Sequence, residues 1–143
     1  MRLVLDTNTA LSGLLWGGPP GRLIQAAEIG EIEVLSSVAL LTELRDVLGR
    51  EKFARRLIQR GFTGDRVFAD YVALVTIVTP ALITPTIMLD PADDAVLAAA
   101  IGAGADLIVS GDAHLLNLKS FQGINIVTAA IADGRIKRPR SSG

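Results

Sequence analysis

The sequence contains no cysteine and a single histidine, His114. The lack of cysteine excludes a disulfide scaffold, a zinc site built on thiolates and a cysteine nucleophile. One histidine also argues against a histidine-rich metal site and against a Ser-His-Asp triad. If the protein holds a metal ion, we therefore expect oxygen ligands.

Neither sign of charge is in excess, because 14 basic and 15 acidic residues give a net charge of −1. The charge of the whole molecule is thus no argument for nucleic-acid binding, which has to be sought in local patches. Half of the residues are hydrophobic and 4% are aromatic. This composition excludes a disordered chain and favours an aliphatic α/β core. The 143 residues fit one domain, since domains have roughly 100–200 residues.

One long uncharged segment, residues 71–89, requires a membrane check. Its length could span a bilayer, but Pro80 and Pro85 interrupt it and four threonines make it polar. We expect the end of a helix, an extended piece and a loop there. The first residues, MRLVLD, lack the long apolar run of a signal peptide. We therefore expect a cytoplasmic protein without a membrane partner.

Short aliphatic runs alternate with helical patterns along the chain. We expect strands at 3–5, 32–35, 107–109 and 124–127, and helices at 9–16, 22–29, from Ser36 or Ser37 to about 48, 51–60, 65–77, from 90 onward, and 113–116. The glycines and prolines at 17–21 indicate a loop. Such alternation predicts one α/β domain over residues 1–143, with a mostly parallel sheet of four to five strands covered on both faces. From about residue 134 we expect a basic, flexible tail.

Acidic residues follow two of the predicted strands, at Asp6 and Asp112. Parallel α/β sheets bind ligands at the carboxyl ends of their strands. Asp93 and Asp94 open a helix that leads into the strand before Asp112, and Glu43 lies within the first two turns of another helix. Carboxylates that converge repel one another, and Mg²⁺ or Mn²⁺ relieves that repulsion. Such an ion activates water for phosphodiester hydrolysis.

Four segments carry a family resemblance, and they occur in this order: LVLDTN, LLTELRDVL, DPADDAVLAAA and IVSGDAHLL. From Met1 to about Val127 the chain resembles PIN domains of the kind found as toxins of toxin–antitoxin systems (VapC-like ribonucleases). The resemblance implies a three-layer fold and a metal-dependent endoribonuclease. It also implies a cognate antitoxin that holds the enzyme inactive, an RNA substrate and a homodimer.

The same resemblance assigns the site. It implies an acidic quartet that holds Mg²⁺ or Mn²⁺ and carries out the chemistry: Asp6, Glu43, Asp94 and Asp112. The 18-residue step to Asp112 favours Asp94 over Asp93, although the adjacent acid stays an alternative. We expect Asn8, Ser110 and Asp93 to contact the metal ligands rather than the ion itself.

A basic stretch occupies the predicted helix at 51–60. At helical spacing Lys52, Arg56 and Arg60 share one face. Two interpretations remain open: a track for the RNA backbone, and a solvated helix face. We expect His114 to be an exposed residue of a short helix.

Two other functions compete with the nuclease. LVLDTNT and GDAHLL also resemble the acidic motifs of haloacid-dehalogenase-like phosphatases. However, Asn8 stands where that family has its second aspartate, and Lys52 is the only lysine before Lys119. The third possibility is a non-catalytic RNA-binding or interaction module, against which the presence of all four acids argues.

Overall fold

The computed structural model describes residues 1–83 and 91–136. Its centre is a six-stranded sheet in the order β3-β2-β1-β4-β6-β5. All neighbouring strands are parallel except β5, which runs antiparallel to β6. The strands are β1 (Arg2–Leu5), β2 (Glu33–Ser36), β3 (Thr76–Ile77), β4 (Leu107–Val109), β5 (Ser120–Phe121) and β6 (Ile124–Val127).

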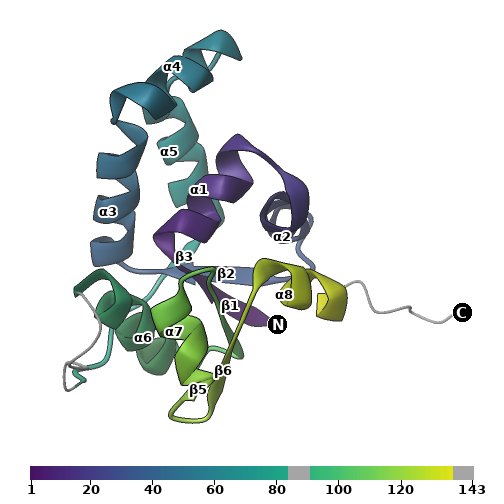
Figure 1. Cartoon of the computed structure of the whole chain (residues 1–143), viewed down its shortest axis with the longest axis vertical. Helices are drawn as coiled ribbons and strands as arrows, with labels where there is room; N and C mark the ends of the chain where they lie inside the picture. Colours follow the sequence, from purple (N-terminus) through teal and green to yellow (C-terminus); the bar gives the residue numbers. More distant parts are fainter. Residues whose placement is uncertain (84–90, 137–143) are drawn as a thin grey trace, which may run out of the picture.

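Helices cover both faces of this sheet (Figure 1). They are α1 (Thr7–Leu15), α2 (Gly18–Glu28), α3 (Val38–Leu48), α4 (Glu51–Gln59), α5 (Gly64–Leu74), α6 (Pro91–Ala103), α7 (Ala113–Leu118) and α8 (Ala129–Ile136). α6 and α7 pack on one face, and α1, α2, α3, α5 and α8 pack on the other. The structure thus confirms a three-layer α/β fold with a mostly parallel sheet.

The central strand shows why the fold needs two helical layers. Leu3 and Leu5 of β1 point into the core beneath α1, α2 and α3, whereas Val4 points into the core beneath α6. All three are at most 3% exposed. A strand buried on both faces has no polar side to alternate with, which is why β1 appears in the sequence as a continuous aliphatic run.

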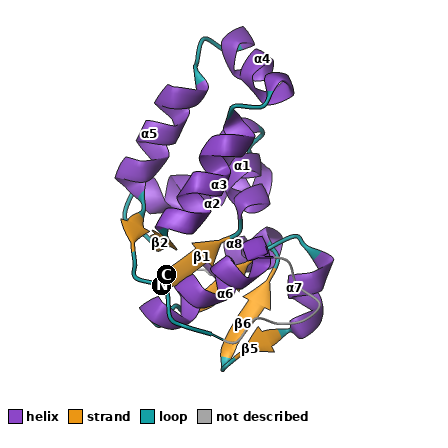
Figure 2. Ribbon diagram, turned by 90° about the vertical axis from the view of Figure 1, so that its left-hand side faces the viewer, coloured by secondary structure: helices purple, strands orange, loops and turns teal. Residues whose placement is uncertain are grey.

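Helices α3, α4 and α5 form an arm that extends away from the sheet (Figures 1 and 2). Leu57 is the buried residue of α4. The ring of Phe53 lies edge-on to that of Trp16 at the end of α1, with 6.0 Å between the centroids. Phe53 and Leu57 therefore hold the basic helix α4 to the body of the molecule.

Some predicted elements were wrong. The loop expected at 17–21 is the start of α2, which begins at Gly18 instead of Arg22. Pro19 and Pro20 lie in its first turn, where the helix needs no N–H donor. The sheet has six strands rather than four to five. β3 and β5 were missed because each has only two residues, which is too short to show a strand pattern. β3 also takes Thr76 and Ile77 out of the helix predicted at 65–77.

The C-terminal helix α8 was not predicted. It continues through Ile136, so the first residues of the expected flexible tail are helical. Asp133 of α8 accepts a hydrogen bond from Arg22 of α2, with 2.7 Å between Nε and Oδ2. The rest of the tail, and the end of the uncharged segment 71–89, lie outside the described residues. Within the described ranges, no helix is long and apolar enough to cross a membrane.

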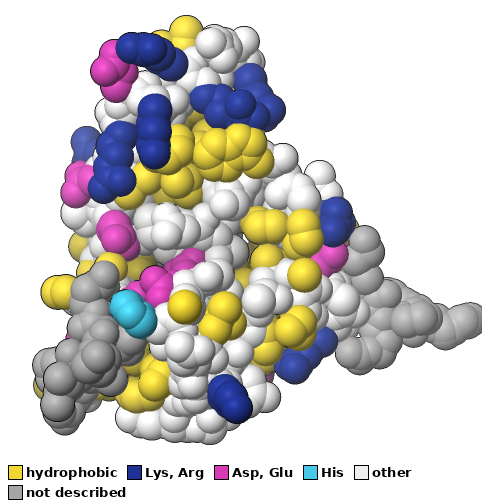
Figure 3. Space-filling model, viewed as in Figure 1, with side chains coloured by type: hydrophobic (Ala, Val, Ile, Leu, Met, Phe, Trp, Pro, Cys, Tyr) yellow, Lys and Arg dark blue, Asp and Glu magenta, His cyan; other side chains and the backbone are white. Residues whose placement is uncertain are grey.

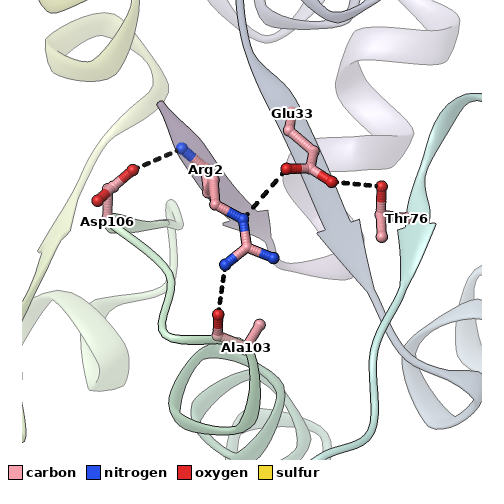
Figure 4. A network of polar contacts seen from close by, with 5 residues as sticks. All are labelled: Arg2, Glu33, Thr76, Ala103 and Asp106. Atoms are coloured by element: carbon pink, nitrogen blue, oxygen red, sulfur yellow. Dashed lines mark hydrogen bonds and ion pairs between the residues drawn. The ribbon is translucent and has the colours of Figure 1, made fainter.

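A polar network joins the amino ends of the strands (Figure 4). Glu33 accepts hydrogen bonds from Thr76 at 2.7 Å and from Arg2 Nε at 3.1 Å. Arg2 also donates to the carbonyl of Ala103, and its N–H donates to Asp106. These contacts tie β1, β2 and β3 to α6 at the edge of the sheet opposite to the carboxyl ends.

Candidate active site

The acidic residues meet at the carboxyl ends of the strands, around a hollow of about 220 Å³. Four segments contribute to it: the end of β1 with the start of α1, the helix α3 with the residue Arg50 after it, the first two turns of α6, and the residues after β4. The lining residues are Asp6, Thr7, Asn8, Glu43, Val47, Arg50, Ala92, Asp93, Val96 and Asp112.

Asp6 is the most firmly held of these acids. Its Oδ1 accepts a hydrogen bond from the N–H of Thr9 at 2.8 Å, which caps the start of α1, and its Oδ2 accepts one from the hydroxyl of Ser110. The residue is 6% exposed. A carboxylate has about four acceptor sites, so each oxygen keeps capacity for a further partner. Burial, and to a smaller extent the charge of Asp6, raise the pKa of Tyr71 on α5.

Glu43 reaches the hollow from α3. Ser37 caps this helix by accepting the N–H of Leu40 at 3.3 Å, and Glu43 follows in the second turn. Its Oε1 accepts a hydrogen bond from the hydroxyl of Thr7, the residue after Asp6. The expected meeting of Asp6 and Glu43 at one hollow is therefore present.

The adjacent acids at the start of α6 point to different places. Asp93 is 7% exposed and lines the hollow. Asp94 is half-buried and is not among the described residues that line it. Asp93 lies on the same helix face as the buried residues Val96, Leu97 and Ala100, at spacings of three, four and seven. Of the two adjacent acids, Asp93 is therefore the one that lines the hollow as described, whereas the 18-residue step had favoured Asp94.

Asp112 and His114 complete the site at the start of α7. Oδ1 of Asp112 accepts the N–H of His114 at 2.7 Å and caps the helix. Asp93, Asp112 and His114 each offer a ligand atom, and these three atoms lie within 4.8 Å of one another. On the surface, the histidine borders the acidic side chains (Figure 3). His114 is exposed as expected, but its proximity to both acids was missed. In the sequence, the position of His114 two residues after Asp112 could have indicated this proximity.

Two of the residues expected to support the ligands, Asn8 and Ser110, line a second hollow of about 260 Å³, whereas the third, Asp93, lines the first. Asn8 and Asp112 line both hollows, and Ser110 lines the second. Ser110 is 1% exposed, and its Oγ also accepts the N–H of Asp112 at 2.9 Å. The two hollows therefore adjoin at Asn8 and Asp112, and Asp112 is the one acid among the described residues that line the second.

The model of the PIN domain family matches residues 2–114. The chain belongs to this family. PIN domains are typically metal-dependent nucleases, and the match includes every acid of the hollow as well as His114. No curated protein matches the sequence.

The donors of this PIN domain suit a divalent cation. Asp6, Glu43, Asp93 and Asp112 place four carboxylates around one hollow, and two of them are buried. Carboxylates removed from water are costly unless cations or donors compensate them. Among the described residues of the lining, Arg50 is the basic one, and it is exposed. Divalent cations such as Mg²⁺ and Mn²⁺ prefer oxygen-rich sites, so the residues fit a divalent ion.

The predicted RNA-binding residues lie on the arm of the PIN domain, where basic side chains gather (Figure 3). Lys52 lies over the ring of Phe53 at 4.8 Å, and Arg56 lies over the ring of Trp16 at 5.1 Å. Arg60 donates a hydrogen bond to the carbonyl of Leu15 at 2.9 Å. None of these basic residues lines the acidic hollow as described. Arg56 and Arg60 therefore hold α4 against the end of α1, a use that neither sequence interpretation included.

Proposed function

We propose that this PIN domain is a metal-dependent endoribonuclease that hydrolyses RNA phosphodiester bonds, and that it is the toxin of a toxin–antitoxin pair. The observation that carries the nuclease proposal is the convergence of Asp6, Glu43, Asp93 and Asp112 on one hollow. These acids come from four separate elements of the fold, and packing of the core has no need for four carboxylates at one point.

In this proposal, Asp93 and Asp112 would hold the ion, and Asp6 and Glu43 line the same hollow. The chemistry that a divalent ion held there would supply is polarisation of a phosphoryl oxygen and activation of a bound water. The hydrogen bonds from Thr9 and Ser110 fix the carboxylate of Asp6. Glu43 accepts the Thr7 hydroxyl at Oε1 and keeps Oε2 as an acceptor for a proton from water.

Binding of RNA requires positive charge near the acids. Arg50 lines the hollow and is exposed, so its guanidinium is a candidate for a phosphate contact. Lys52, Arg56 and Arg60 continue the positive surface along α4. Single-stranded RNA fits this arrangement, because its flexible backbone can run from the arm into the hollow.

The resemblance to toxins supports the remaining parts of the proposal, which are a cognate antitoxin and a homodimer. An adjacent small reading frame that encodes a DNA-binding protein would support the antitoxin. Light scattering on the isolated chain at micromolar concentration tests the homodimer, and a monomer there would count against it.

Cleavage of RNA in the presence and absence of divalent ions tests the nuclease proposal directly. The wild-type chain should cleave with Mg²⁺ or Mn²⁺ and stop when a chelator is added. Asp6→Asn should lose cleavage yet stay folded, because asparagine caps helices as well as aspartate does. Asp65→Asn, an exposed acid on α5, is the matched control and should cleave normally.

Three outcomes would count against this mechanism. Hydrolysis of small phosphate esters without RNA cleavage would favour the phosphatase alternative. RNA binding without any cleavage, with every divalent ion tried, would favour the non-catalytic module. Cleavage by Asp6→Asn in the presence of chelator would exclude the metal mechanism.

A further inference from the structure

We infer that His114 is a metal ligand of this site, and that its imidazole makes the site prefer Mn²⁺ to Mg²⁺. This inference rests on the proposed metal-dependent function and names the residue that selects the ion. It also replaces the expectation of oxygen ligands alone, because the only histidine of the chain lies at the acids rather than elsewhere on the surface.

The spacing of the donor atoms supports a shared ion. Ligand atoms of Asp93, Asp112 and His114 all lie within 4.8 Å of one another. Nδ1 of His114 is 3.9 Å from Oδ1 of Asp112, which is too long for a hydrogen bond. Two ligands that each lie about 2.1 Å from one ion are about 3 Å apart at right angles and about 4.2 Å apart when opposite. The 3.9 Å between Nδ1 of His114 and Oδ1 of Asp112 falls within this span.

The backbone holds His114 in position while its ring stays accessible. Its N–H is bonded to Oδ1 of Asp112 at 2.7 Å, so the first turn of α7 cannot move away from the acid without breaking the cap. The next residue, Leu115, is fully buried and anchors α7 in the core. The imidazole side chain itself is 63% exposed. A ring on a fixed backbone can bind an ion with little reorganisation of the protein.

The chemistry of the donors then sets the choice of ion. Mg²⁺ prefers oxygen ligands and exchanges them reluctantly for nitrogen. First-row transition ions accept imidazole readily, and affinity for nitrogen donors rises along the series that begins with Mn²⁺. Two carboxylates with one imidazole therefore favour Mn²⁺, whereas the carboxylates alone discriminate less.

Titration calorimetry with MnCl₂ and MgCl₂ on the full chain tests this preference without measuring cleavage. His114→Ala should weaken Mn²⁺ binding at least about tenfold, since removal of even the residues behind the ligands costs about 10–100-fold in affinity. Mg²⁺ binding should change less than about threefold, because Mg²⁺ gains little from nitrogen. Asn117→Ala, an exposed change on the same helix, is the control and should leave both affinities unchanged.

The single histidine allows a second, direct measurement. Its ring gives the only imidazole NMR signals of the chain, so substoichiometric Mn²⁺ should broaden those signals in the wild-type protein and in Asn117→Ala. His114→Gln serves as a second variant in case the alanine variant unfolds, and it should also lose the preference for Mn²⁺.

The outcomes separate this inference from the proposed function. If the wild-type chain binds Mn²⁺ and cleaves RNA, but His114→Ala and His114→Gln bind Mn²⁺ equally well, His114 is not a ligand and only this inference fails. Sharp ring signals in the presence of bound Mn²⁺ would also overturn it. If the wild-type chain binds no divalent ion, both proposals fail.

Discussion

The hydroxyl of Ser110 donates a hydrogen bond to the carboxylate of Asp6, although 104 positions separate the two residues in sequence. The same oxygen accepts the N–H of Asp112 at 2.9 Å. One buried hydroxyl therefore connects the ends of β1 and β4, the two adjacent strands that carry an acid of the site. The carboxylate of Asp6 is thus oriented both by this contact and by the cap of α1.

Removal of this hydroxyl tests its importance. Ser110→Ala leaves a buried carboxylate oxygen without its donor, which should lower the free energy of unfolding by about 1.5–3 kcal/mol, the range for hydrogen bonds to charged groups. Metal-dependent cleavage should fall as well, because Asp6 loses its fixed orientation. Denaturant unfolding and cleavage assays provide the two measurements. Ser120→Ala, on the exposed strand β5, is the control, and equal stability of the two variants would contradict the prediction.

Asp93 should be essential and Asp94 dispensable. Asp93 lines the hollow on the buried face of α6, whereas Asp94 is turned about 100° away. We expect Asp93→Asn to lose both Mn²⁺ binding and cleavage, and Asp94→Asn to keep both. Calorimetry and cleavage on the two single variants decide the matter. An active Asp93→Asn together with an inactive Asp94→Asn would restore the assignment favoured by sequence spacing.

Asp93 and Asp94 show what could not be predicted from the sequence. Strands β1, β2, β4 and β6 were predictable because buried aliphatic runs identify them, and Asp6 and Asp112 followed as residues after strands. The helix α6 is apolar on almost every side, as its segment AVLAAAIGAGA shows. Its sequence therefore gives no direction for the face that turns inward. Only the packing of α6 against β1, β2 and β4 decides which acid enters the hollow.

The residues that sequence reasoning missed depend on tertiary contacts. Arg50 follows α3, and its side chain borders the acids only because α3 packs against α6. His114 needs the turn after β4 to bring it to Asp93. The strands β3 and β5, with two residues each, are too short to show a pattern.

Arg50 should contribute to RNA binding more than its neighbours on the arm. Removing one contact to a phosphate flattens the slope of log affinity against log salt by about 0.7 for single strands. Arg50→Gln should show this flatter slope in anisotropy titrations with single-stranded RNA, measured in the inactive Asp6→Asn background. Arg55→Gln is the matched control, because Arg55 is exposed and pairs with Glu51 on α4. Equal slopes of log affinity against log salt for the two variants would show that Arg50 makes no contact with the RNA backbone.

Arg60 should matter for stability. Its guanidinium donates to the carbonyl of Leu15 at the end of α1, so Arg60→Gln should lower the free energy of unfolding by about 0.5–1.5 kcal/mol, the usual value of one hydrogen bond. Gln59→Ala, an exposed change at the end of α4, should be nearly neutral. Denaturant unfolding of both variants measures the difference. If Arg60→Gln is as stable as the wild type, the arm does not depend on this contact.

Glu33 lies at the amino end of β2, away from the active site, and should make the stability of the fold depend on pH. Hydrogen bonds from Thr76 and then from Arg2 lower the pKa of Glu33 below its ordinary value of 4.5 (Figure 4). The folded chain thus favours the ionised carboxylate, so this stabilisation is complete above pH 4.5 and is lost as the pH falls through the lower pKa of the folded state.

Glu33→Gln should therefore be less stable than the wild type at about pH 7, and the difference should shrink as the pH falls through the lowered pKa of Glu33 in the folded state. Denaturant unfolding at a series of pH values measures this difference. Glu31→Gln, an exposed change two residues earlier, should show no such trend. Because Glu33 is exposed to solvent, added salt should weaken the ion pair with Arg2 while leaving the hydrogen bond from Thr76. A difference between wild type and Glu33→Gln that stays constant from neutral to acidic pH would show that the network at the amino ends of the strands does not depend on the charge of Glu33.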